Sequence, residues 1–166
     1  MDDNFSADKD PEPAEGPDME AVAILEKYLI ADGWHPQQQE EEGDFLAQFV
    51  GENGEYRCFF QIHTEFDQFF CYVLAPDSVP EERRMAAAEY LTRANYGLHI
   101  GNFEMDFEDG EVRYKSSLDF EDETLTDNWL SGTIYPAVYT MDSYLPGLAA
   151  VIAGTSPEAA IAEVEE

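Results

Sequence analysis

The sequence predicts an α+β fold in which one antiparallel sheet of about five strands carries its helices on one face. Three observations lead to this prediction. Segments 18–32 and 125–153 repeat apolar residues at steps of three and four, as amphipathic helices do. The segments between them alternate apolar and polar residues, as strands do. Asn53-Gly54 and Asp109-Gly110 are typical of tight turns between strands. The predicted order of elements is α-β-β-β-α-β-β-α.

The first helix is expected at 18–32, because Met19, Val22, Leu25 and Leu29 form one apolar stripe. Gly33 is a suitable residue to end it. Residues 35–42 are polar, and we interpret them as a strand or loop outside the core.

Three strands are expected next, at 44–51, 55–63 and 68–75. If Asn53-Gly54 is the two-residue loop of the first hairpin, Phe49 lies opposite Cys58. The alternation then assigns one face to the core: Phe45, Ala47, Phe49, Cys58, Phe60, Ile62, Phe69, Cys71 and Val73. The other face carries Leu46, Gln48, Val50, Arg57, Phe59, Gln61, His63, Phe70, Tyr72 and Leu74. Because that second face is too apolar for a solvated surface, either another part of the chain or a partner is expected to cover it.

A second helix is predicted at 79–95, where Ser78 and Glu81 have the spacing of a capping box and Gly97 provides a stop. Strands at 100–107 and 112–118 follow around Asp109-Gly110. The third helix, 125–153, has the clearest periodicity in the chain. Pro136 and Pro146 lie inside it and predict kinks or a break.

Composition and charge predict one domain at 17–154, after an acidic disordered arm at 1–16 and before an acidic tail at 155–166, which could also form a frayed helical turn. The chain has 37 acidic and 8 basic residues, a net charge of −29. Such a charge argues against binding to nucleic acid or anionic membranes and favours basic partners. The simpler interpretation is that the charge only keeps the protein soluble. The acidic N-terminus lacks the apolar run of a signal peptide, so a cytoplasmic location is expected.

No residue pattern points to catalysis, so the chain is predicted not to be an enzyme and to need no cofactor. The residues around Gly110 do not match a calcium-binding loop, because Met105 and Phe107 occupy positions that need oxygen ligands. The histidines lack the spacing of metal ligands, and no metal site is predicted. Cys58 and Cys71 are expected to be buried free thiols, with a disulfide as the alternative.

Two stretches resemble a known family. Residues 90–106, YLTRANYGLHIGNFEMD, resemble the middle of YbjN-like proteins, and residues 141–152, MDSYLPGLAAVI, resemble their C-terminal helix. The resemblance extends over about 18–154 and implies a bacterial protein with a fold similar to type III secretion chaperones. Members of that wider class are small, acidic, often dimeric and bind protein segments. The family's biochemistry is poorly defined, and no catalytic residue is carried over from it.

Together these observations predict a non-enzymatic, chaperone-like protein-interaction module, in the role of a stress or signalling regulator. It would bind a protein segment, or a second copy in a homodimer, through the outer sheet face and the third helix. The residues expected to contact the partner are Phe59, Phe70, Tyr72, Tyr135 and Tyr139. The alternatives are a small-molecule or metal-responsive regulator and an acidic mimic of nucleic acid.

Overall fold

The computed structural model describes residues 19–166, so the predicted arm at 1–16 lies outside the described residues. The helices are α1 (Met19–Ala31), η1 (Glu81–Arg83), α2 (Arg84–Gly97), α3 (Asp127–Ala153) and α4 (Pro157–Val164). The strands are β1 (Gln37–Gln38), β2 (Asp44–Val50), β3 (Glu55–His63), β4 (Gln68–Leu74), β5 (Asn102–Met105) and β6 (Val112–Asp119). The predicted α+β class and order of elements are confirmed, with the short strand β1 and the helix α4 added and with η1 leading directly into α2.

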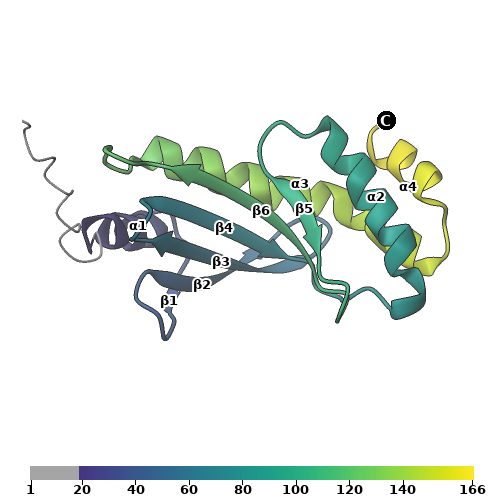
Figure 1. The fold of residues 1–166 in the computed structure, drawn as a ribbon, viewed down its shortest axis with the longest axis horizontal. Helices are drawn as coiled ribbons and strands as arrows, with labels where there is room; N and C mark the ends of the chain where they lie inside the picture. The colour runs from purple at the N-terminus through teal and green to yellow at the C-terminus, as the bar shows by residue number, and fades with distance from the viewer. Residues whose placement is uncertain (1–18) are drawn as a thin grey trace, which may run out of the picture.

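The sheet has six antiparallel strands in the order β1-β2-β3-β4-β6-β5. The additional strand is β1, which pairs with β2 at only two positions. The long helix α3 runs along one side of the sheet, with α1 near one end and α2 and α4 near the other (Figure 1). Within residues 19–166, no helix lies against the opposite side of the sheet. The fold therefore has one helical layer and one sheet with an open face.

The predicted core face is the face that the helices cover. Its predicted residues are buried, apart from the half-buried Phe49 at the end of β2. The β2–β3 register, however, differs from the prediction. Phe49 lies opposite Tyr56 rather than Cys58, and the turn is centred on Glu52 and Asn53. Because the shift is two residues, every side chain stays on its predicted face.

The cause of the shifted turn is Asp142, which lies on α3, far away in the sequence. Its carboxylate accepts hydrogen bonds from the backbone N–H groups of Glu52 and Asn53, both at 2.9 Å, and from the Tyr56 hydroxyl at 2.7 Å. Pro146 has no N–H to donate to the carbonyl of Asp142 four residues earlier. The Asn53 side-chain amide donates to that carbonyl instead, at 3.0 Å. A tertiary contact therefore determines the turn.

Helix α3 is continuous over both prolines, so the predicted break is absent. Pro136 has no N–H to donate to the carbonyl of Gly132, four residues earlier. Gly132 lies on the exposed side of the helix. The apolar stripe of α3 packs on the sheet as predicted. Its buried members are Leu130, Ile134, Val138, Met141 and Leu148, and Leu145 and Ile152 are half-buried.

The predicted capping box at Ser78 and Glu81 is wrong. The helical segment begins at Glu81 after Pro80, without a side-chain cap. Val79 is buried, and its N–H donates to the carbonyl of Gly110 in the β5–β6 turn at 2.8 Å. This contact places residues 78–80 against that turn, and the helix begins only after them.

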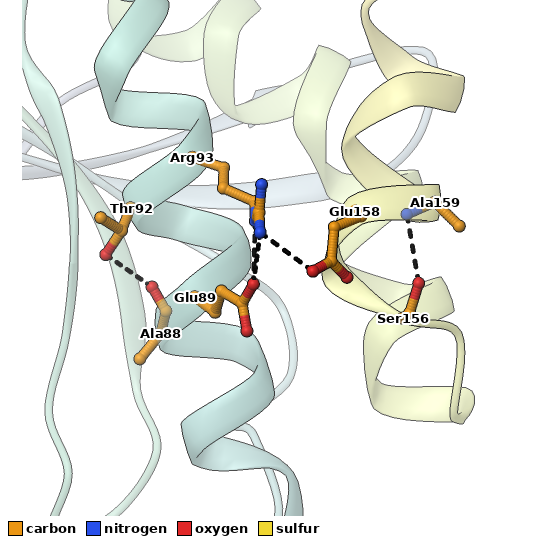
Figure 2. Close-up of polar contacts among 7 residues, drawn as sticks. All are labelled: Ala88, Glu89, Thr92, Arg93, Ser156, Glu158 and Ala159. Carbon is orange, nitrogen blue, oxygen red and sulfur yellow. Dashed lines mark hydrogen bonds and ion pairs between the residues drawn. The ribbon is translucent and has the colours of Figure 1, made fainter.

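Residues 155–166 were expected to form a frayed helical turn or an acidic tail, and most of them form the regular helix α4. Ser156 caps it by accepting a hydrogen bond from the Ala159 N–H at 3.3 Å (Figure 2). Pro157 and Ala160 are buried where α4 packs against α2 and α3. The Arg93 guanidinium of α2 forms ion pairs with the carboxylates of Glu89 at 2.7 Å and of Glu158 in α4 at 3.0 Å (Figure 2). The acidic composition of the segment concealed a helix with an apolar side.

Candidate protein-binding surface

The open side of the sheet, here called the outer sheet face, carries three of the five predicted contact residues. Phe59 of β3 lies directly opposite Tyr72 of β4 in the sheet register, and Phe70 lies two residues before Tyr72 on the same strand. The rings of Phe70 and Tyr72 are nearly parallel, with centroids 6.0 Å apart. His63 lies beside Phe70 at 4.6 Å between ring centroids. The three predicted residues thus form one aromatic patch.

The patch is half-buried because β3 and β4 are central strands whose side chains shield one another. Leu46 of β2 continues the cross-strand row of Phe59 and Tyr72, and the buried Leu74 lies in the adjacent row. The patch therefore keeps some exposed apolar area that a partner can bury.

Basic residues border the aromatic patch. Arg113 of β6 lies with its guanidinium carbon 4.5 Å from the centroid of the Tyr72 ring, a cation–π geometry. Glu104 of β5 pairs with Arg113 at 2.8 Å and also with Lys115. Although burial by itself raises the pKa of the Glu104 carboxyl, the hydrogen bonds from Lys115 and Arg113 outweigh it and hold that pKa below its usual value.

Arg57 of β3 lies on the same face and completes this border. Arg57, Arg113, Phe59, Tyr72 and Leu74 line a depression of about 310 Å³, together with Gln61 and Glu111. The outer sheet face is therefore aromatic in the centre, with Arg57 and Arg113 on one side and the carboxylates of Glu104 and Glu111 beside them.

Tyr135 and Tyr139 lie on the other side of the sheet. With Trp34 and Phe49 they form what we call the α3 aromatic cluster, in which Tyr135 stacks on Tyr139 with centroids 5.7 Å apart. Tyr139 is 57% exposed. The five predicted contact residues thus belong to two separate surfaces, and a single short segment on the outer sheet face does not reach Tyr135 or Tyr139.

Asp32 holds the α3 aromatic cluster together, and sequence reasoning missed it. One carboxylate oxygen accepts hydrogen bonds from Tyr28 at 3.2 Å, Trp34 at 3.0 Å and Tyr135 at 2.6 Å. The hydrogen bond to Asp32 is the largest influence on Tyr135 and raises the pKa of its hydroxyl to about 12. The cluster connects α1 to α3, and its signal in the sequence was the Asp32-Gly33-Trp34 helix end.

The predicted cysteines are buried free thiols, as expected. Burial raises the pKa of the Cys58 thiol to about 12 and that of Cys71 well above its usual value. In residues 19–166, no group of three or more His, Cys, Asp or Glu side chains is arranged to hold a metal ion. In the same part of the chain, no helix combines the length and the apolar character that crossing a membrane requires.

The fold and the open face define a class: small α+β proteins in which one helical layer covers one side of an antiparallel sheet. Residues 21–150 match the family YbjN, described as "Putative bacterial sensory transduction regulator". The chain belongs to this family, as the resemblance of residues 90–106 and 141–152 implied.

Comparison with solved structures agrees with this fold. The crystal structure of YbjN from E. coli, described as "a putative transcription regulator", is similar with a TM-score of 0.55 and 10% identity, over 73% of this chain and 85% of that one.

Two more distant similarities are to chains of the HopA1-SchA chaperone-effector complex and the ExsC-ExsE complex. Both have a TM-score of 0.47, with 12% and 14% identity, and cover 75% of this chain and 91% and 90% of those chains. A comparison with curated proteins found no match.

Proposed function

We propose that this protein is a non-enzymatic interaction module that binds a segment of a partner protein on its outer sheet face, in the role of a regulator. The observation that carries the proposal is the aromatic patch of Phe59, Phe70 and Tyr72 on a face that no described helix covers. Membership of a family described as regulators supports the same role.

The aromatic patch is suited to a binding contribution of useful size. Burying apolar surface contributes roughly 25 cal/mol per Å², and an aromatic side chain presents on the order of 200 Å² in total. Half-buried rings such as Phe59 and Tyr72 retain part of that area. Each can therefore contribute about 1–2 kcal/mol to a complex, the range of moderate hot-spot residues.

The partner as a whole is proposed to be basic. The net charge of −29 creates a long-range field that accelerates the approach of a positively charged protein and slows that of an acidic one. The same field opposes close approach of a second copy, so we rank a homodimer behind a different partner protein. The α3 aromatic cluster, with its exposed Tyr139, is a second contact region for a larger partner.

Affinity capture with matched variants tests the proposal. The purified full chain, its Phe59→Ala/Tyr72→Ala variant and its Tyr96→Ala variant are each immobilised in native lysate, and retained proteins are quantified by mass spectrometry. Tyr96 is the control because it is an aromatic residue that is 96% exposed and belongs to α2, in the helical layer rather than on the outer sheet face. The expected result is a protein that the wild type and Tyr96→Ala retain and the double variant loses.

Light scattering after size exclusion reports the oligomeric state of the same three samples. Equal retention of every captured protein by all three variants contradicts binding at the outer sheet face. So does a strict monomer that retains no protein at all.

A further inference from the structure

The basic residues of this acidic chain are unevenly placed. Of its 8 Lys and Arg residues, three lie on the outer sheet face: Arg57 on β3, and Arg113 and Lys115 on β6. The face also carries carboxylates, among them Asp44, Glu104, Glu111 and Asp119, so the three cations form a local basic group within it rather than a positively charged face.

The arginines elsewhere in the described chain have structural partners. Arg83 donates hydrogen bonds to the carbonyls of Val151 and Thr155, and these bonds join η1 to the end of α3. Arg84 donates to the carbonyls of Val79 and Phe107. Arg93 pairs with Glu89 and Glu158, as described above. These three side chains stabilise the folded chain.

Arg57 differs from those arginines. Its side chain is exposed, and no hydrogen bond or ion pair joins it to another residue of the described chain, 19–166. It lies in one cross-strand row with Leu74 and Arg113, because Leu74 is opposite both of them in the register. At about 4.8 Å between neighbouring strands, the two arginines are about 10 Å apart at their Cα atoms.

The adjacent row, two residues along the strands, contains Phe59, Tyr72 and Lys115. An extended peptide repeats its side-chain direction every two residues, about 6.8 Å, which is also the spacing of the two rows. A segment that runs along the strands can thus place one side chain over Leu74, between the two arginines, and the next over Phe59 and Tyr72.

We infer that the outer sheet face recognises an extended partner segment in which a carboxylate side chain precedes or follows an apolar one by two residues. Arg57 and Arg113 hold the carboxylate, and Phe59 and Tyr72 hold the apolar side chain. A guanidinium group is suited to this role because it binds carboxylates through two parallel hydrogen bonds. The inference rests on the proposed function and specifies the local chemistry of the segment, whereas the net charge acts on the approach of the whole partner.

Three synthetic peptides test the inference. The first is Thr-Glu-Thr-Phe-Thr-Val-Thr, in which Glu, Phe and Val share one side of an extended chain. The second and third replace its Glu by Gln or by Lys. Each is titrated into the ¹⁵N-labelled full chain at 150 mM salt, and the chemical-shift changes give both the Kd and the strands that are contacted.

The Glu peptide is expected to shift resonances of β3, β4 and β6 and to bind about fivefold more tightly than the Gln peptide, with the Lys peptide weaker than both. Arg57→Gln should abolish the preference for Glu over Gln and leave the Gln peptide within about twofold of its wild-type Kd. Lys27→Gln makes the same charge change on an exposed residue of α1 and should leave the preference intact.

Equal affinity of the three peptides at β3, β4 and β6 overturns the carboxylate inference but supports protein binding at the outer sheet face. Tighter binding of the Lys peptide overturns the inference in favour of selection by net charge. Shift changes confined to other elements, or no binding, contradict both the inference and the proposed surface. If the wild type is a dimer and the Tyr72→Glu substitution makes it monomeric, the inference is also overturned, because a second copy then occupies the face.

Discussion

The two faces of the central sheet differ in the environment of their aromatic residues. Phe60 and Phe69 point toward the helices and are completely buried, whereas their neighbours Phe59 and Phe70 point the other way and stay half-exposed. Strand alternation puts chemically identical side chains into these opposite environments. The comparison teaches that composition cannot separate the aromatics of the core from those of the open face, and that the position of the helix layer does.

The largest expected effect is on the covered face. Phe60→Ala should lower the free energy of unfolding by about 3–5 kcal/mol, because it leaves a cavity among residues that cannot collapse into it. Phe59→Ala, one residue earlier, should lower it by less than about 1 kcal/mol. Chemical denaturation of both variants measures the difference. Similar losses in the two variants would break the distinction between the faces.

The next effect concerns Asp142, which joins the β2–β3 turn to α3 on the covered side. Asp142→Ala should cost about 2–3 kcal/mol, because it removes the acceptor of three hydrogen bonds, including that of the buried Tyr56. The same denaturation experiment measures this loss. A loss below about 1 kcal/mol would show that water replaces the carboxylate at the turn.

Asp142 also predicts a pH dependence. Burial by itself raises the pKa of its carboxyl, but hydrogen bonds from Tyr56 and from the backbone of Asn53 and Glu52 outweigh it and lower the pKa below 3.8. Because this pKa is lower in the folded state, the ionised Asp142 carboxylate contributes its full stabilisation at pH values above the unfolded pKa of 3.8. That stabilisation is lost as the pH falls through the folded-state pKa. Between about pH 5 and pH 3, wild type should therefore lose more stability than Asp142→Asn. Parallel stability profiles of the two proteins would contradict this.

A smaller effect is expected at the β5 edge of the sheet. The Asn95 side chain accepts from the Phe103 N–H at 2.7 Å and donates to the Phe103 carbonyl at 3.1 Å, much as a neighbouring strand would. Asn95→Ala should cost about 1–2 kcal/mol and expose the Phe103 amide to hydrogen exchange. Tyr96→Ala is the matched control and should do neither. Unchanged protection of Phe103 in Asn95→Ala would show that the edge needs no such partner.

The sequence predicted the two faces of the sheet but not the rows along them. Alternation assigned Phe59, Phe70 and Tyr72 to one side, and a register error of two residues left that assignment unchanged. The rows depend on the register, and the register of the first hairpin depends on Asp142, about 90 residues away. A local turn signal such as Asn53-Gly54 contains no information about such a contact.

The same limit applies to the helices. The periodicity of 125–153 predicted which residues of α3 are buried, but it did not predict which face of the sheet α3 packs against. Tyr135 and Tyr139 were therefore grouped with residues that lie across the sheet. For α4 a local signal was present, since Ser156-Pro157 is a typical helix start, but the acidic composition of 155–166 outweighed it.

The most direct test of the central claim, that the outer sheet face binds a partner protein, is site-specific photocrosslinking in cells. A photoreactive phenylalanine analogue replaces Phe59, Tyr72, Tyr139 or Tyr96, one at a time, and mass spectrometry identifies the adducts. We predict that positions 59 and 72 crosslink the same protein and that position 96 does not, while position 139 reports whether the partner also reaches the α3 aromatic cluster. Adducts at position 96 without adducts at 59 and 72 would contradict the account.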